Sequence, residues 1–595
     1  MLKKFFMNTL SSFVGAWIAL ALFGVVAVVV CIGLMARLGA SSSTPSVSSH
    51  SVLRIDLSDA IVETASTPDF NLGSVMNADF KRPQALNVLV KALEEAAENK
   101  NIDAVYIECG GASAGLATLD ALRSAVLEFK KSGKKVVAYG DSFTMGDYFV
   151  ASAADSIFLN HEGSVQLMGI TGYVSYMKSL FDKLGISFQI AKVGTFKSAV
   201  EPMIMDEMSA PARAQLDTLY GNMWKYITQT VSSDRKKLSP AKINSLINDS
   251  SITFRQSGDI LRAGLVDALV YSRQVKPRIA SIIGRPVEKL NFVSPSTLVD
   301  QTDWGMAYSA KDRIALLYAS GDIEDGSDSG IDFMKLVPVI TELADDDHVK
   351  GMVLRVNSPG GSVFGSAEIG EALDYFQSKG KPLAVSMGDY AASGGYWISC
   401  CADRIFADPL TITGSIGIFG MFPNIAATTR MVGVNMQMVS TNPQAAFPSL
   451  FRPMDERQLA VLQNMVEKGY DKFVGRVAKG RKLSEEKVRA VAEGRVWDAA
   501  TAVELKLVDQ IGGVGNALEW VAGKAGLKKA GNVAVYPRVE ASIWDFIPSS
   551  SDLAMMALVK NLAPSGIDAE ALQAASKILA RKPVQARMME MSVGF

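Results

Sequence analysis

This chain contains an internal duplication. Residues that lie 248 positions apart match repeatedly, beginning with Gly140-Asp141 and Gly388-Asp389. Further glycines, aromatic residues and apolar pairs recur at that spacing: Tyr148 and Tyr396, Ile157-Phe158 and Ile405-Phe406, Gly169 and Gly417, Gly172 and Gly420, Gln189 and Gln437. With a small gap, Leu265-Val266-Asp267 aligns with Leu507-Val508-Asp509. A repeat of this length indicates two copies of one structural unit, so both halves are expected to share a fold.

Each copy alternates strand-like and helix-like segments. Buried strands are predicted at VLRIDL, AVYIEC and VVAYG in the first copy and at IALLYA, GMVLRVN and LAVSMG in the second. Helices are predicted at Ala114–Lys131 and Gly365–Lys379, and longer ones at Ala210–Ser232 and Asp455–Lys479. This alternation is typical of an α/β layered fold with mostly parallel strands.

The pattern divides the chain into parts. We predict one domain over 52–290 and a second over 313–548, joined by 291–312. The tail 549–595 reads as a helix followed by an extended end, and its role is left open.

Composition excludes several functional classes. A chain of 595 residues is too long to fold around a single hydrophobic core. The net charge of −1 gives no indication of a basic surface that would bind nucleic acid. Four cysteines are too few for a disulfide scaffold, and their spacing does not suit a metal. We therefore expect no metal, no other cofactor and no nucleic acid partner.

The N-terminus predicts a membrane anchor. Phe13–Met35 is apolar, uncharged and long enough to cross a bilayer. Lys3 and Lys4 precede it, which favours a cytoplasmic segment 1–12 and an extracytoplasmic body. A cleaved signal peptide is the alternative. A flexible linker is expected at 36–51, where serine is frequent.

The second copy carries a candidate nucleophile, Ser393, in the run GDYAASGG. Small neighbours allow close approach of a substrate, and Gly394 offers a backbone N–H for an oxyanion. The glycines Gly360-Gly361 of NSPGGSV offer a second donor. A helix packing point and an ordinary turn are the structural alternatives. The first copy has Met145 where the second has Ser393.

The first copy carries a candidate base, Lys197, in VGTFKSAVEP, where the second copy has Ala445. A lone lysine is most often a solvated surface charge, but here lysine and serine are each lost from the opposite copy. The three histidines, His50, His161 and His348, lie outside such motifs. A lysine acts as a base only when neutral, which requires burial to lower its pKa from about 10.4. It would then accept the serine proton and pass it to the leaving amine.

The motifs GTFKSAVEP, RVNSPGGSV, GDYAASGGYWIS and TITGSIGIFG resemble those of the signal peptide peptidase A (protease IV) family in its long two-domain form. The resemblance extends over nearly all of the chain. It implies a tandem Clp protease/crotonase-like fold and a serine endopeptidase with a Ser-Lys dyad. By this match Ser393 is the nucleophile and Lys197 the general base. Gly394, Gly360 and Gly361 would form the oxyanion hole, and Ser415 would orient the lysine.

The same resemblance implies a setting and a substrate. Members are homotetramers of the bacterial inner membrane, with active sites that face the membrane, and they degrade cleaved signal peptides. Apolar peptides and membrane lipid are therefore the expected partners. An apolar groove would suit them, and Thr413–Phe422 is a candidate wall, with core packing as the alternative.

Two other functions stay open from the residues alone. A crotonase-type enzyme acting on acyl-CoA would share the layered fold and the oxyanion glycines, but it would need neither the serine nor the anchor. A membrane scaffold with an inactive protease fold would need no dyad at all.

Overall fold

The computed structural model describes residues 47–64, 83–248, 256–299, 307–326, 330–538, 584–588 and 592–594. The predicted anchor Phe13–Met35 and most of the tail after Ser549 lie outside these ranges. Within them, no helix is both long and apolar enough to cross a membrane.

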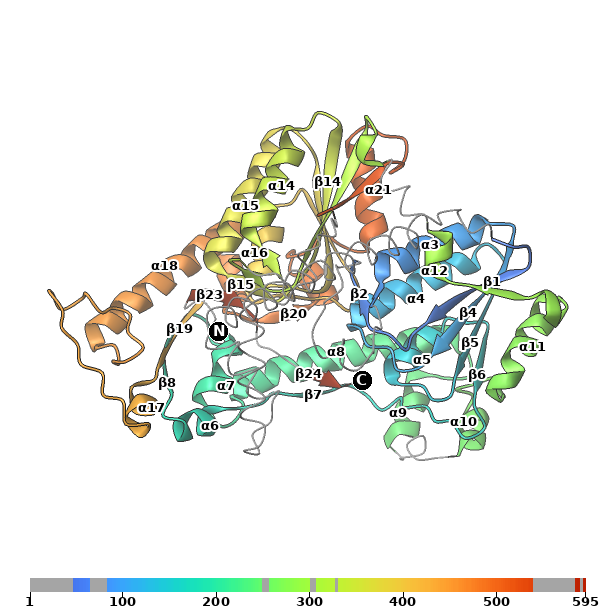
Figure 1. Ribbon diagram of the computed structural model, residues 1–595, viewed down its shortest axis with the longest axis horizontal. Coiled ribbons are helices and arrows are strands. Elements are labelled where there is room, and N and C mark those ends of the chain that lie inside the picture. The colour runs from blue at the N-terminus through green and yellow to red at the C-terminus, as the bar shows by residue number, and fades with distance from the viewer. Residues whose placement is uncertain are drawn as a thin grey trace, which may run out of the picture. The chain divides into compact units, whose positions relative to one another are not determined.

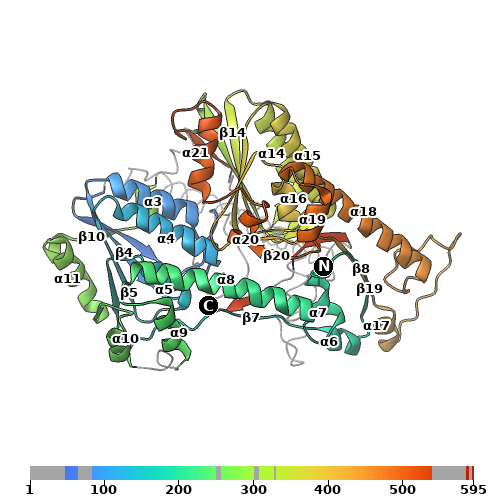
Figure 2. The same cartoon turned by 180° about the vertical axis from the view of Figure 1, so that it is seen from behind.

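The first copy builds a six-stranded sheet in which all neighbouring strands are parallel. Its order is β10-β1-β4-β5-β6-β9, with bounds Asn291–Val293, Ser51–Asp56, Ile102–Cys109, Lys135–Gly140, Ser156–Leu159 and Ala268–Leu269. Helix α11 (Ser272–Ile283) covers one face, and α3 (Leu86–Glu98) and α4 (Leu116–Lys130) cover the other (Figure 2). Burial on both faces explains why these strands are almost continuously apolar.

The second copy builds an eight-stranded sheet around the path β20-β18-β16-β14-β11-β22, with β17 beside β16 and β21 beside β17. In that order the strands span Val496–Asp498, Ile412–Gly414, Leu383–Ala392, Val349–Ser358, Arg313–Ser320, Val533–Tyr536, Arg404–Ala407 and Gln510–Ile511. Side chains alternate between the faces, as the pleat requires. Helices α14 (Phe333–Asp345) and α15 (Val363–Ser378) lie on one face of this sheet and α21 (Val514–Lys524) on the other (Figure 1). Leu317 packs with the first two helices, whereas Leu316 packs with α21.

Equivalent residues of the two copies make the same contacts. The hydroxyls of Tyr148 and Tyr396 each donate to a backbone carbonyl at 2.8 Å, that of Leu265 in one copy and Leu507 in the other. In both copies the aspartate two residues later, Asp267 or Asp509, accepts a strand N–H at 2.8 Å and pairs with an arginine. The duplication is therefore structural, and the chain has a mixed α/β fold.

Two long helices match the predictions closely. Helix α8 (Ala210–Asp234) begins where the Ser209 side chain accepts the Ala212 N–H, and α18 (Glu456–Arg481) begins with a capping box at Asp455. Helix α8 belongs to the first copy but reaches the second, because the Asn222 amide donates to the Asp498 carboxylate at 2.8 Å.

A third sheet joins segments from distant parts of the chain. Its order is β13-β12-β15-β23-β19-β8, with bounds Ile331–Asp332, Ile323–Glu324, Gly360–Ser362, Val584–Arg587, Phe419–Asn424 and Ser187–Lys192. Strand β8 comes from the first copy and pairs antiparallel with β19 of the second along its whole length. Strand β23 comes from the C-terminal tail. This sheet brings the segment before Lys197 to the second copy.

Candidate active site

Ser393 lies where β16 ends and the short helix α16 (Gly394–Ser399) begins. Its backbone has φ 55° and ψ −112°, a conformation that costs an L-residue about 1–3 kcal/mol. The Ser393 N–H donates to the Gly414 carbonyl at 2.8 Å, which helps to hold this turn. The side chain is fully buried. The backbone is therefore strained at Ser393, the residue that the sequence predicts as the nucleophile.

Lys197 lies between β8 and a single 3-10 turn, Ser198–Val200. The neighbouring Phe196 N–H donates to the Glu493 carbonyl of the second copy at 3.0 Å. Gly494, with φ 75°, packs directly on the lysine, and a Cβ there would lie 2.6 Å from the Lys197 Cβ. Glycine is required at this position, because a side chain would displace the lysine backbone.

The two copies bring the lysine and the serine together. Lys197 Nζ lies 2.7 Å from Ser393 Oγ, although 196 residues separate them in the chain. The same nitrogen lies 3.0 Å from Ser415 Oγ and 3.2 Å from the Ser415 carbonyl oxygen. Ser415 itself has φ 51°, and its N–H donates to the Arg495 carbonyl at 2.7 Å. The second copy thus surrounds the amine with three oxygens.

Burial lowers the pKa of Lys197 well below its usual value of 10.5. A neutral amine has two N–H donors and one lone pair. The three oxygens suit that form, because the amine can donate to both Ser415 oxygens while its lone pair accepts from the Ser393 hydroxyl. A hydroxyl next to such an amine can lose its proton to it.

Two of the predicted oxyanion glycines, Gly360 and Gly361, lie in β15, which contacts α16. Gly361 has φ 152°, and a Cβ there would lie 2.1 Å from the Ile323 carbonyl oxygen of β12, so glycine is required. The Gly360 N–H donates to Ser358 Oγ at 3.2 Å. Gly394 is the first residue of α16. All three glycines therefore stand near the serine turn, and their role as oxyanion donors stays a prediction.

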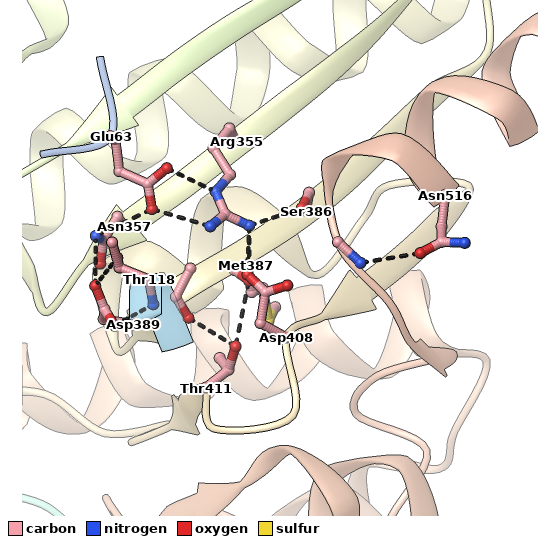
Figure 3. A network of polar contacts seen from close by, with 12 residues as sticks. Glu63, Thr118, Arg355, Asn357, Ser386, Met387, Asp389, Asp408, Thr411 and Asn516 are labelled. Atoms are coloured by element: carbon pink, nitrogen blue, oxygen red, sulfur yellow. Dashed lines mark hydrogen bonds and ion pairs between the residues drawn. The ribbon is translucent and has the colours of Figure 1, made fainter. Parts of the chain in front are cut away.

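A buried polar network adjoins the serine strand and contains residues of both copies (Figure 3). Arg355 of β14 is almost fully buried and pairs with Glu63 of the first copy at 3.0 Å and with Asp408 at 2.7 Å. A buried arginine between two carboxylates satisfies groups that would otherwise be costly to desolvate. Glu63 thus ties the first copy to the central strand of the second.

Asn357, near the end of β14, belongs to this network (Figure 3). Its Oδ1 accepts the Tyr390 N–H at 3.0 Å, and its Nδ2 donates to Glu63 at 3.3 Å and to Asp389 at 3.2 Å. Asp389 also accepts the N–H and the hydroxyl of Thr118 from the first copy. Asp389 and Tyr390 stand shortly before Ser393, and Asn357 shortly before Gly360. The network therefore links both parts of the candidate site to the first copy.

A small, partly open pocket lies beside the lysine. Its walls include Phe196, Leu216, Ser415 and Val496, and Met588 of the C-terminal tail also lines it. The pocket therefore mixes apolar side chains with the polar Ser198, Gln215 and Ser415 around the amine.

Other candidates lie elsewhere. His50 contacts Asp103, and His161 stacks on Tyr271. Met145, the counterpart of Ser393, is buried at the start of α5 (Met145–Ala151). Of the predicted groove wall Thr413–Phe422, Ile416 and Ile418 pack into the core, whereas Phe419 lies in β19 next to β23.

Sequence reasoning missed several residues at the site. Gln215 bonds the Ser198 hydroxyl and the Val496 N–H, and Asp322 pairs with Arg587 of the tail. Glu63 and Met588 were also not singled out. None of them stands in a recognisable motif, and only the apolar-polar alternation near the C-terminus could have drawn attention to the tail.

Comparisons with known proteins place the chain in a peptidase family. The model of peptidase family S49 matches twice, over residues 128–282 and 375–528. Protease 4 of Haemophilus influenzae is 36% identical over 72% of this chain and 71% of its own length. Protease 4 of Salmonella typhi is 32% identical over 94% of this chain and 92% of its own length.

A plant relative and one solved structure are more distant. The chloroplastic serine protease SPPA of Arabidopsis thaliana is 26% identical over 77% of this chain and 67% of its own length. A ClpP1 mutant of Listeria monocytogenes matches 36% of this chain and 98% of its own, with 13% identity and a TM-score of 0.24, too low to carry an argument. The chain belongs to peptidase family S49 as a serine protease of the Protease 4 and SppA type.

Proposed function

We propose that the chain is a membrane-anchored endopeptidase in which Ser393 attacks the peptide carbonyl and Lys197 is the general base. The distance of 2.7 Å between Lys197 Nζ and Ser393 Oγ, in a fully buried setting, is the observation that carries this proposal. The amine takes the hydroxyl proton as Oγ bonds to the carbonyl carbon, then gives it to the leaving amine. Water hydrolyses the resulting acyl-enzyme by the same route.

The same geometry supports roles for the other residues of the site. Ser415 holds the amine through its hydroxyl and carbonyl, which aims the lone pair at Ser393. Gly394, Gly360 and Gly361 are the proposed N–H donors for the oxyanion. This mechanism uses no metal or other cofactor.

Substrate and location are proposed from the sequence. The apolar run Phe13–Met35 supports a single-pass anchor in the inner membrane of a bacterium, with the body on the outer side. Cleaved signal peptides and similar apolar peptides are the proposed substrates, because they remain in the membrane next to such a body. A homotetramer is the proposed assembly.

One experiment tests the activity and the anchor together. Membranes containing the full chain are washed with carbonate and treated with a fluorophosphonate probe that labels reactive serines. We expect label in the membrane pellet on the wild type and none on Ser393→Ala, and peptide cleavage should fall by at least about a thousandfold. Label on Ser393→Ala would show that the nucleophile is another residue, and release of the protein into the carbonate wash would refute the anchor.

A further inference from the structure

Two adjacent cysteines, Cys400 and Cys401, stand at the end of α16 and take no part in the proposed mechanism. Cys400 is fully buried, whereas Cys401 is partly exposed. Their sulfurs lie 4.0 Å apart, close enough for one thiol to donate to the other. The Cys400 thiol also donates to the Trp397 carbonyl at 3.4 Å, and the Cys401 thiol donates to the Arg476 carbonyl at 3.6 Å. The structure therefore holds one accessible and one enclosed thiol in contact.

Helix α18 packs directly on the backbone of this pair. A Cβ at Gly480 would lie 2.2 Å from the Cys400 carbonyl oxygen and 2.9 Å from the Cys401 Cα. Glycine is therefore required at this position, because a side chain would push the helix away from the Cys400–Cys401 peptide. The contact fixes the backbone that carries both thiols, so the two sulfurs remain neighbours.

The two thiols differ in acidity. The hydrogen bond with Cys400 and the nearby cations of Arg476 and Lys479 lower the pKa of the Cys401 thiol, against the opposing effects of burial and of Asp374. Burial raises the pKa of the Cys400 thiol well above its usual value. The thiolate is the form of cysteine that attacks electrophiles. Cys401 is therefore the thiol that reacts first, and Cys400 is the protonated neighbour that meets the product.

We propose that Cys400 and Cys401 form an oxidation site, at which a hydroperoxide converts the two thiols into a disulfide between adjacent residues. The Cys401 thiolate attacks one oxygen of the hydroperoxide. The S–O bond forms as the O–O bond breaks, and the departing oxygen takes up a proton and leaves as water or an alcohol, so the sulfur is oxidised to a sulfenic acid and the peroxide is reduced. The Cys400 thiol then attacks this sulfur, the S–S bond forms, and the hydroxyl group leaves with the Cys400 proton as water.

The disulfide that forms here is expected to be reversible. It closes a small ring that contains the Cys400–Cys401 peptide, and the ring is strained because the packing of Gly480 restricts rotation of that peptide. Strained disulfides have higher reduction potentials and are the labile ones. A thiol reductant such as glutathione should therefore return both residues to thiols.

Cys109 offers a control within the same chain. It is buried in β4, and burial raises the pKa of its thiol well above the usual value. A buried neutral thiol is a poor nucleophile, so Cys109 should stay reduced under conditions that oxidise Cys401.

The test treats the full chain with hydrogen peroxide at neutral pH, blocks the remaining thiols and follows each cysteine by mass spectrometry of its peptides. In the wild type, the peptide that contains Cys400 and Cys401 should lose two hydrogen atoms at least roughly tenfold faster than Cys109 is oxidised. It should regain them when the peroxide is removed and glutathione is added. In Cys400→Ser, Cys401 should instead remain a sulfenic acid that dimedone traps. In Cys401→Ser, Cys400 should react no faster than Cys109.

Three results would overturn the proposal. Oxidation of Cys401 no faster than that of Cys109 would show that the pair is not a reactive site. A sulfenic acid trapped at Cys401 in the wild type, without loss of hydrogen, would exclude Cys400 as the second thiol, and a disulfide between two chains would assign that role to another molecule. The pair and Cys109 are compared in the same wild-type sample, so misfolding of a variant cannot produce the expected result. Because no cleavage is measured, the outcome does not depend on the proposed function.

Discussion

At the scale of single residues, burial of Lys197 costs stability, and its proposed role as the general base would explain that cost. The unfolded chain holds a proton on this lysine at pH values where the folded protein does not, because burial lowers the folded pKa. The unfolded state therefore binds more protons between the folded pKa and 10.5. In that window the free energy of unfolding should rise with pH, by up to about 1.4 kcal/mol per pH unit.

The variant Lys197→Met isolates the contribution of Lys197 to the pH dependence of the free energy of unfolding. Methionine has a similar shape and cannot titrate, so the variant should lose that slope, and peptide cleavage should be abolished. Methionine cannot make the hydrogen bonds of Lys197 to Ser415, and their loss lowers the free energy of unfolding. That loss does not change how the free energy of unfolding depends on pH. Urea unfolding of both proteins across pH 6 to about pH 10 measures it. Parallel curves for the two proteins would mean that the lysine is charged in the folded state.

Wild-type cleavage should follow the same titration. Activity should rise with pH as Lys197 loses its proton and should level off well below 10.5. If cleavage still requires Lys197 but its rate does not rise with pH below 10.5, the prediction of a neutral amine is wrong.

At the scale of elements, Asn357 joins the ends of β14 and β16. Asn357→Asp keeps the acceptor for the Tyr390 N–H but replaces the donor that faces Glu63 and Asp389 with a negative oxygen. We expect the free energy of unfolding to fall by about 1–3 kcal/mol and kcat to fall at least tenfold where the protein remains folded. Asn99→Asp, at the end of α3, is the control and should leave both unchanged. An unchanged kcat would show that the network stabilises the fold without positioning the serine.

Sequence reasoning succeeded at this scale where a signal is local or repeated. Helices α8 and α18 lie within two residues of their predicted bounds, because capping residues and apolar periodicity mark them. The equivalence of Tyr148 and Tyr396 could be predicted, since the duplication repeats the contact together with the residue.

The same reasoning failed where a contact depends on distant partners. Strand β23 is four residues long, and its place between β15 and β19 follows from edges that other parts of the chain create. Glu63 is an ordinary glutamate in the sequence and becomes buried only because Arg355 lies opposite it. Proximity of Lys197 to Ser393 was expected from chemistry, whereas the pairing of β8 with β19, which brings the second copy to the lysine segment, was not.

At the scale of the whole molecule, the lysine and the serine meet within one chain. Mixing Ser393→Ala protein with Lys197→Ala protein should therefore restore no cleavage, even in mixed oligomers, because each chain lacks one half of its own dyad. Cleavage is measured after dissociation and reassembly of the mixture, with reassembled wild type as the control. Recovery towards a quarter or more of the wild-type rate would mean that the dyad forms between chains.

The order in which the two copies leave the ribosome determines when the proposed dyad is first complete. Lys197 is synthesised 196 residues before Ser393. At roughly 5–20 residues per second, the first copy waits about 10–40 s for the hydroxyl that its amine is proposed to activate. A nascent chain therefore has no complete Lys197–Ser393 pair until the second copy has been synthesised as far as Ser393 and has folded against the first.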